Sequence, residues 1–241
     1  THTGRLNASA RFSARQLLVS RVAATLHRDA DASGGRRDLH RRHWPVNAGA
    51  WITVSGGTSK RAKRQLVEDL YYQIVAQARQ PIFYRDYLVP DTINGRFDMI
   101  ILLTALIVRR LRSEIQSDEA RTLADGLFEV LFADMDRSLR EMGVGDIRVG
   151  KKVKAMAQAY YGRSQAYDDA LDGKEPLEAA LARNLYGDPS TAEAQGGGVP
   201  PVHALADYIR NTVTSLETHP FEALMAGDPG ISAPPEPRQA L

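Results

Sequence analysis

The most apolar stretch of the chain lies near its middle, at residues 99–108, where Thr104 is the one polar residue. A helix with apolar side chains on every side has to be surrounded by other elements. Ten such residues are too few to cross a bilayer, which takes about 20 residues. The pattern therefore predicts the central helix of an all-helical domain, with charged residues in its first and last turns.

Apolar residues at spacings of three and four predict further helices on both sides of this segment. The expected helices cover residues 59–79, 117–142, 146–171, 177–185 and 202–216. We therefore expect an all-α fold with a single globular helical domain of about five or six helices. The expected organisation is a basic, largely disordered arm (1–58), the helical domain (59–187), a linker (188–200), a C-terminal helix (201–218) and a disordered tail (219–241).

The loop before the central helix, residues 81–95, is expected to hold one conformation. Pro90 restricts Val89 to an extended backbone, and Asp91 or Thr92 can cap a turn. An Asn-Gly pair that tolerates positive φ follows, and we expect it to lie just before the helix begins.

Arg96 stands where this loop meets the helix, and it is close in sequence to Asp98. If the loop folds back, Arg96 also comes near Tyr84 and Asp91. A guanidinium can bind two acceptors at once, so Arg96 is predicted to lock the loop and to shape a groove for a binding partner.

The net charge of +2 combines two opposite contributions. Residues 1–64 have a net charge of +10, and residues 65–241 have a net charge of −8. The chain has no cysteine, which excludes disulfides, thiolate metal sites and a cysteine nucleophile. No run of about 18 apolar residues occurs, so we expect any membrane contact to be peripheral.

The basic charge is concentrated in the N-terminal arm. Residues 1–27 contain arginines and no acidic residue, as in an organellar presequence or a helix that lies on an anionic surface. An uninformative upstream segment is an equally good interpretation of the arm. A basic cluster follows it at the start of the first expected helix and forms the candidate contact for a ribosome or nucleic acid: Lys60, Arg61, Lys63 and Arg64.

Two motifs resemble catalytic or ligand sites without matching their context. Residues 145–151 read GDIRVGK, but a phosphate-binding loop needs a preceding strand and a following Ser or Thr. The carboxylates of Asp134 and Asp136 lie two residues apart on an expected helix and point in different directions, so pairing with arginines is the favoured interpretation. We expect no enzyme activity, no metal and no cofactor.

Other side chains favour a binding surface. Tyr84 and Tyr161 suit the rim of a protein-binding groove and the rim of a helical core equally well, whereas core packing is favoured for the other tyrosines. Lys151, Lys152 and Lys154 crowd the start of an expected helix, which is unfavourable for the helix dipole, so we expect an acidic group nearby.

Three blocks of sequence carry a family resemblance: FYRDYLVPDTINGRFDMI, RRLR and LFADMDRSLREMGVGDIRVGKKVKAMAQAYYGRSQAYDDAL. They resemble the ubiquinol–cytochrome c chaperone family over roughly residues 60–187. The chain departs from the family pattern at Leu103, where the family often carries a histidine, so a role of that histidine cannot be transferred.

The resemblance implies a chaperone that binds newly made cytochrome b during the biogenesis of ubiquinol–cytochrome c reductase. It implies action in the bacterial cytoplasm at the inner membrane, or alternatively on the matrix side of the mitochondrial inner membrane. The ribosome and a small partner protein are further implied partners, and no direct DNA binding is expected. A ribosome- or nucleic-acid-associated protein is the alternative. The candidate client-binding or loop-shaping residues are Tyr84, Pro90, Asp91, Arg96, Asp98, Asp134, Tyr161 and Arg163.

Overall fold

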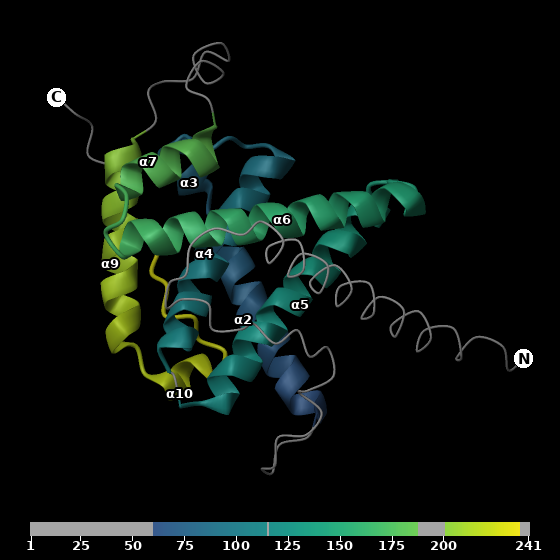
Figure 1. Cartoon of the computed structure of the whole chain (residues 1–241), viewed down its shortest axis with the longest axis horizontal. Coiled ribbons are helices and arrows are strands. Elements are labelled where there is room, and N and C mark those ends of the chain that lie inside the picture. Colours follow the sequence, from purple (N-terminus) through teal and green to yellow (C-terminus); the bar gives the residue numbers. More distant parts are fainter. Residues whose placement is uncertain (1–59, 115, 188–200, 237–241) are drawn as a thin grey trace, which may run out of the picture. The chain divides into compact units, whose positions relative to one another are not determined.

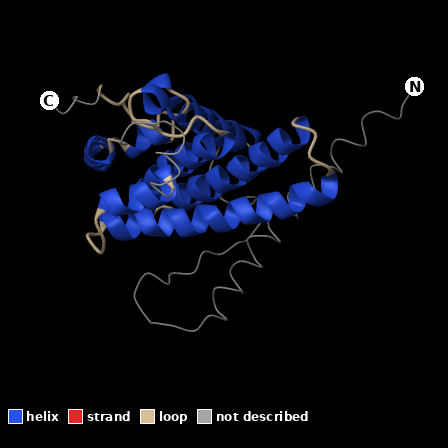
Figure 2. Ribbon diagram, turned by 90° about the horizontal axis from the view of Figure 1, so that it is seen from above, coloured by secondary structure: helices blue, strands red, loops and turns tan. Residues whose placement is uncertain are grey.

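A computed structural model describes residues 60–114, 116–187 and 201–236, and within these ranges every regular element is a helix (Figure 1; Figure 2). The prediction of an all-α fold is confirmed. The elements are α2 (Lys60–Ala78), α3 (Pro81–Arg85), α4 (Ile93–Ser113), α5 (Asp118–Glu141), α6 (Asp146–Leu171), α7 (Leu177–Leu181), the π-helix η2 (Ala182–Tyr186), α9 (Val202–Thr218) and α10 (Phe221–Leu224). The predictions for the arm, the linker and the last five residues lie outside the described residues.

Contacts divide the described residues into two compact groups. The first group, which we call the helical body, comprises residues 61–127 and 160–236 of the described chain. The second group is the α5–α6 hairpin, residues 128–159. Each group is described by itself below.

Helix α4 is the core of the helical body, as its apolar pattern predicts. Every residue from Phe97 to Val108 is buried, including Thr104. The helix contacts α9 and η2, which follow it far along the chain (Figure 1). Thr92 is the N-cap of α4, and its side-chain oxygen accepts a hydrogen bond from the backbone N–H of Gly95. This cap satisfies one of the donors that a helix start leaves without a partner.

The start of α4 differs from the prediction in one respect. Asn94 and Gly95 lie inside the first turn of the helix, and Gly95 does not have a positive φ. Glycine is needed there for another reason, because a Cβ at Gly95 would lie 2.0 Å from the carbonyl oxygen of Pro90. The residue with positive φ in this loop is Leu88, at 54°.

The segment after α9 corrects another expectation. Residues 219–236 fall in the tail predicted to be disordered, yet they contain α10 and contact the rest of the helical body. The hydroxyl of Tyr87 donates to the carbonyl of Pro235 at 2.7 Å, and the hydroxyl of Tyr208 donates to the carbonyl of Ser232 at 2.9 Å. Buried hydroxyls need such partners, so these bonds hold the tail along its described length.

The α5–α6 hairpin closes at a tight turn. Gly143 has a φ of +78°, which ends α5 in the left-handed conformation that the sequence predicts for this glycine. Its N–H donates to the carbonyl of Arg140, and the N–H of Val144 donates to the carbonyl of Leu139. Helix α6 then starts at Asp146, so nearly all of the motif at residues 145–151 forms the first turns of α6, and the element before it is a helix and not a strand.

Candidate functional site

Arg96 lies at the junction of the loop and α4 and contacts two of the three residues expected near it, Asp91 and Tyr84. Its Nε–H donates to Oδ1 of Asp91 at 2.6 Å, and its guanidinium carbon lies 5.0 Å from the centre of the Tyr84 ring. A guanidinium over an aromatic face is attracted by the ring quadrupole. The structure thus supplies one carboxylate and one ring face in place of the two acceptors expected for Arg96.

This group of side chains lies at the protein surface. The side chains of Arg96 and Asp91 are exposed, whereas Tyr84 is partly buried and donates through its hydroxyl to the carbonyl of Ala78 at 2.7 Å. Tyr84 therefore has one polar end bound to α2 and one ring face against Arg96. We call Tyr84, Pro90, Asp91 and Arg96 the loop cluster.

Hydrogen bonds to the backbone hold the loop that carries the loop cluster. The N–H of Val89 donates to the carbonyl of Phe83 at 3.0 Å, and the side chain of Val89 is buried. The buried hydroxyl of Tyr186, in η2, donates to the carbonyl of Tyr87 at 2.8 Å. The loop is therefore tied to an element about 100 residues further along the chain.

Asp98 and Arg163 form an ion pair that joins α4 to α6 within the helical body. The distance from Nη1 of Arg163 to Oδ1 of Asp98 is 3.1 Å, and Asp98 is buried. The guanidinium also donates from Nε to the carbonyl of Asn184, in η2, at 3.2 Å. Asp98 was expected near Arg96, but the structure pairs each of them with a different residue.

Burial raises the pKa of Asp98 to about 6, although the nearby Arg163 guanidinium acts in the opposite direction. The free-energy cost of removing the carboxylate from water is thus larger than its stabilisation by the Arg163 guanidinium. The ion pair fixes the position of α6 against α4 without being a large net source of stability.

We expect the Asp98→Asn variant to have a different pH dependence of stability from the parent protein. Because the folded pKa of Asp98 lies above its unfolded value of 3.8, the folded state binds this proton more tightly. The contribution is fully present below about pH 4 and is lost as the pH rises through 6. A shift of this size corresponds to about 3 kcal/mol.

The free energy of unfolding of the variant should therefore rise relative to the parent by about 3 kcal/mol between pH 4 and pH 8, as measured by urea denaturation. Asp207→Asn, at an exposed position on α9, is the matched control and should show no such change. Parallel pH profiles for the parent and Asp98→Asn would contradict the assignment.

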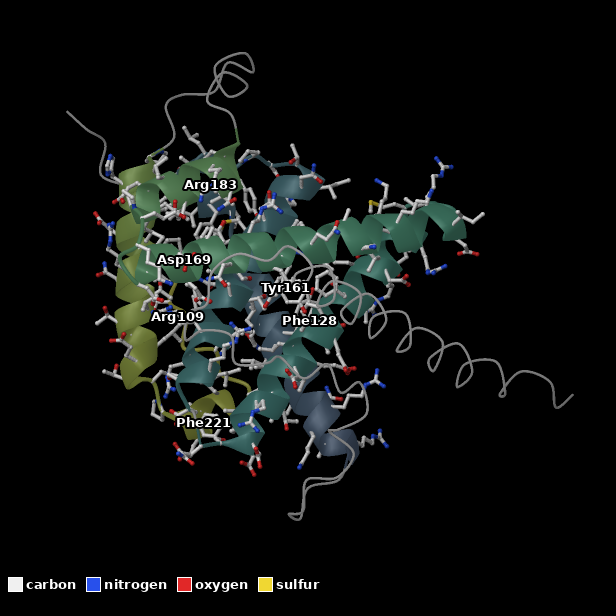
Figure 3. All side chains as sticks on the ribbon, in the orientation of Figure 1. Arg109, Phe128, Tyr161, Asp169, Arg183 and Phe221 are labelled. Atoms are coloured by element: carbon white, nitrogen blue, oxygen red, sulfur yellow. The ribbon has the colours of Figure 1, made fainter. Side chains whose placement is uncertain are left out.

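A second ionic network lies at the end of α4, where Figure 3 labels Arg109 on α4 and Asp169 on α6. Arg109 binds Asp172 at 2.7 Å and Asp168 at 3.3 Å, both on or just after α6. Arg112 lies 3.7 Å from Asp168. These pairs form a second ionic link between α4 and α6, in addition to the Asp98–Arg163 pair. The spacing of these residues in the sequence does not predict the contacts.

Tyr161 lies on α6 and is partly exposed (Figure 3). Burial of its hydroxyl raises its pKa, and the neighbouring Tyr160 acts in the same direction. The position suits the rim of a surface, so the two interpretations of Tyr161 stay open. Core packing is confirmed for the buried tyrosines Tyr87, Tyr160, Tyr167 and Tyr186.

Asp134 lies in the α5–α6 hairpin, where it pairs with Arg137 at 3.1 Å. Its neighbour Asp136 is buried and pairs with Arg140 at 2.7 Å. The favoured interpretation, that these carboxylates pair with arginines, is confirmed. In the ranges that the structure describes, no group of three or more potential ligands is arranged to hold a metal ion.

The basic candidates begin α2. Arg61 and Arg64 are exposed, Lys63 is partly exposed, and Arg64 pairs with Glu68 at 2.8 Å. The side chain of Lys60 lies outside the described residues. The structure gives these residues no part in the loop cluster.

The described chain is an all-helical protein in which Arg96 holds a surface loop and the buried Asp98 pairs with Arg163. Comparison with known families assigns this all-helical protein to one of them. Residues 85–232 match the family model described as "Ubiquinol-cytochrome C chaperone", and the chain therefore belongs to this family of respiratory-complex assembly chaperones.

Two known proteins are similar to the chain. The crystal structure of the Cbp3 homolog from Brucella abortus is 36% identical with a TM-score of 0.58, and the match covers 70% of this chain and 89% of that one. Ubiquinol-cytochrome c reductase complex assembly factor 1 of Drosophila melanogaster is 21% identical over 165 residues, which are 66% of this chain and 61% of the fly protein. The chain thus spans less than two thirds of that relative.

The matched residues include Pro90, Asp91 and Arg96 of the loop cluster, the Asp98–Arg163 pair and Tyr161, and Tyr84 lies just before the match. Leu103 is fully buried on α4. Among the described helices, none is both long and apolar enough to span a membrane.

Proposed function

We propose that this chain binds newly made cytochrome b and supports the biogenesis of ubiquinol–cytochrome c reductase. Membership of the chaperone family supports the assembly role. The proposed place of action is the bacterial cytoplasm at the inner membrane, with the matrix side of the mitochondrial inner membrane as the alternative. A ribosome and a small partner protein are proposed as further partners.

The observation that carries the proposal is the loop cluster at the protein surface, with its exposed Arg96 and Asp91. Arg96 and Asp91 are held by a 2.6 Å hydrogen bond, and the Tyr84 ring lies under the guanidinium. Arginine and tyrosine are the residues that most often dominate protein interfaces, because they combine large contact area with defined hydrogen bonds. A loop that is already ordered loses little entropy when a partner binds.

We propose a binding role without catalysis. The candidate carboxylates Asp91, Asp98 and Asp134 each lie in an ion pair with an arginine. A carboxylate that is bound to a guanidinium contributes to structure by fixing the position of its partner.

The alternative function, association with the ribosome or with nucleic acid, is supported by the basic residues at the start of α2. Arg61 is exposed, and Lys63 is partly exposed. The two functions are compatible, because a chaperone for a newly made membrane protein has reason to lie near the site of synthesis. Salt dependence distinguishes this contact, since phosphate binding weakens steeply as salt rises.

Site-specific photo-crosslinking tests the proposed client. A photoreactive amino acid at position 93, where Ile93 is 64% exposed beside the loop cluster, should give an adduct with newly made cytochrome b in growing cells. The same amino acid at position 207, on the exposed face of α9, is the control and should give none. Absence of the adduct at position 93, or equal adducts at both positions, would refute the proposed surface.

A further inference from the structure

The turn of the α5–α6 hairpin exposes apolar side chains that no other part of the hairpin covers. Ile147 is 83% exposed and Met142 is 50% exposed, and Val144 between them is partly exposed. Burying side chains of this size is normally favourable, so a group of them in water at one turn marks a contact surface. We call residues 141–154 the hairpin tip.

Positive charge surrounds these apolar side chains. The hairpin tip carries four cations, none of which forms an ion pair with any residue that the structure describes: Arg148, Lys151, Lys152 and Lys154. The acidic side chain of Asp146, by contrast, is bound by Arg140. With Glu141 and Asp146 included, the four cations leave the hairpin tip with a net charge of +2, in a chain whose residues 65–241 carry a net charge of −8.

The cations share the outer side of α6. Ile147 and Lys151 are four residues apart, which places them on the same helix face. Val149 and Val153 occupy the opposite face and are buried. The face of α6 that carries Val149 and Val153 is therefore buried. The opposite face is basic and carries the exposed Ile147.

These charges are unfavourable where they stand. Along α6, Arg148 lies three and four residues before Lys151 and Lys152, and Lys151 lies three residues before Lys154; like charges at these helical spacings repel. An acidic group is expected near these lysines; Asp146 lies in the first turn of α6 but is bound by Arg140, and none of the three lysines forms an ion pair with a described residue. A partner with negative charge meets that requirement.

We propose that the hairpin tip docks on an anionic lipid surface, with Met142 and Ile147 entering the interface and the four cations contacting the headgroups. Apolar side chains flanked by Lys and Arg are the pattern of peripheral membrane binding, in which apolar burial and electrostatic attraction add. The inference rests on the proposed function, since it supplies a means of holding the chaperone where a membrane subunit is made. We name a lipid surface as the partner because the four cations face outward around the small apolar group of Met142 and Ile147.

The absence of natural cysteine allows a direct test on the full chain. The variants Ile147→Cys and Met142→Cys are labelled with a polarity-sensitive fluorophore and mixed with vesicles of phosphatidylcholine containing about 30% phosphatidylglycerol, because an anionic surface attracts basic segments. Both labels should show a blue-shifted, brighter emission. The label in Ile93→Cys, at a similarly exposed apolar position, is the matched control and should not change.

The charge requirement is tested on the same labelled protein. Replacing Lys151, Lys152 and Lys154 by glutamine should weaken the partition into anionic vesicles at least about tenfold, and pure phosphatidylcholine vesicles should give no blue shift. An unchanged emission of the label at 147 in the presence of anionic vesicles would overturn the proposal, as would a shift seen only when a membrane protein is added. Because the vesicles contain no protein, this result is independent of whether cytochrome b is the client.

Discussion

Replacing Arg163 by methionine should lower the free energy of unfolding by about 3 kcal/mol at pH 8, because the buried carboxylate of Asp98 loses its partner. Methionine occupies a similar volume and adapts to its surroundings, so a packing defect is not the expected cause. For a domain of 150–250 residues this corresponds to a fall of about 6–12 °C in Tm. The loss should be smaller at pH 5, where Asp98, with a pKa of about 6, is largely protonated.

A second substitution separates the charge from the packing. In the Arg163→Met/Asp98→Asn protein no buried charge is left without a partner, so most of the lost stability should return. Urea denaturation gives the free energy of unfolding of the parent, of both single variants and of the double variant, which completes a double-mutant cycle. If the double variant is as unstable as Arg163→Met, then Arg163 acts through its bond to the Asn184 carbonyl and not through Asp98.

The helices of the fold could be predicted because each has a local cause. The apolar run at residues 99–108 has no exposed side, and every one of these residues is buried on α4. The left-handed Gly143 ends α5 where the Gly-Val-Gly sequence suggested. Periodicity and turn chemistry depend on neighbours in the sequence, so they can be read without the structure.

The contacts between distant segments could not be predicted in the same way. Asp98 and Arg163 were both candidate residues, but nothing in their spacing of 65 residues indicates that they meet. The described tail is held by hydroxyl bonds to the carbonyls of Ser232 and Pro235, and backbone acceptors leave no signature in the sequence. The π-helical turn at Ala182–Tyr186 was likewise expected as ordinary helix.

The loop cluster is a mixed case. Proximity in sequence correctly suggested that Arg96 meets Tyr84 and Asp91. The requirement for Gly95 was attributed to backbone conformation, whereas the cause is the approach of the Pro90 carbonyl. Such a close approach is a property of the folded loop, so a sequence pattern alone shows the glycine without its reason.

The Arg96→Lys variant should fold normally and bind the client weakly. The ion pair with Asp91 is exposed, and such pairs contribute at most about 1 kcal/mol, so Tm should change by less than about 4 °C. Lysine keeps the charge but loses the planar group that lies over the Tyr84 ring. Loss of an interface arginine commonly weakens binding by about tenfold or more, and we expect a loss of this size.

A matched control is available on α9. The side chain of Arg210 is 46% exposed, as is that of Arg96, and it binds Glu178 at 2.7 Å. Arg210→Lys therefore makes the same chemical change to an exposed ion pair outside the loop cluster. It should leave both folding and client binding unchanged.

The deciding measurement is the cytochrome b content of cells that lack the native protein and express either variant, determined by absorption spectroscopy together with the level and the Tm of each variant. Cells with Arg210→Lys should contain as much cytochrome b as cells with the parent protein. Cells with Arg96→Lys should contain clearly less, at an unchanged level of the variant. A normal cytochrome b content with Arg96→Lys would contradict the assignment of the loop cluster as the client-binding surface.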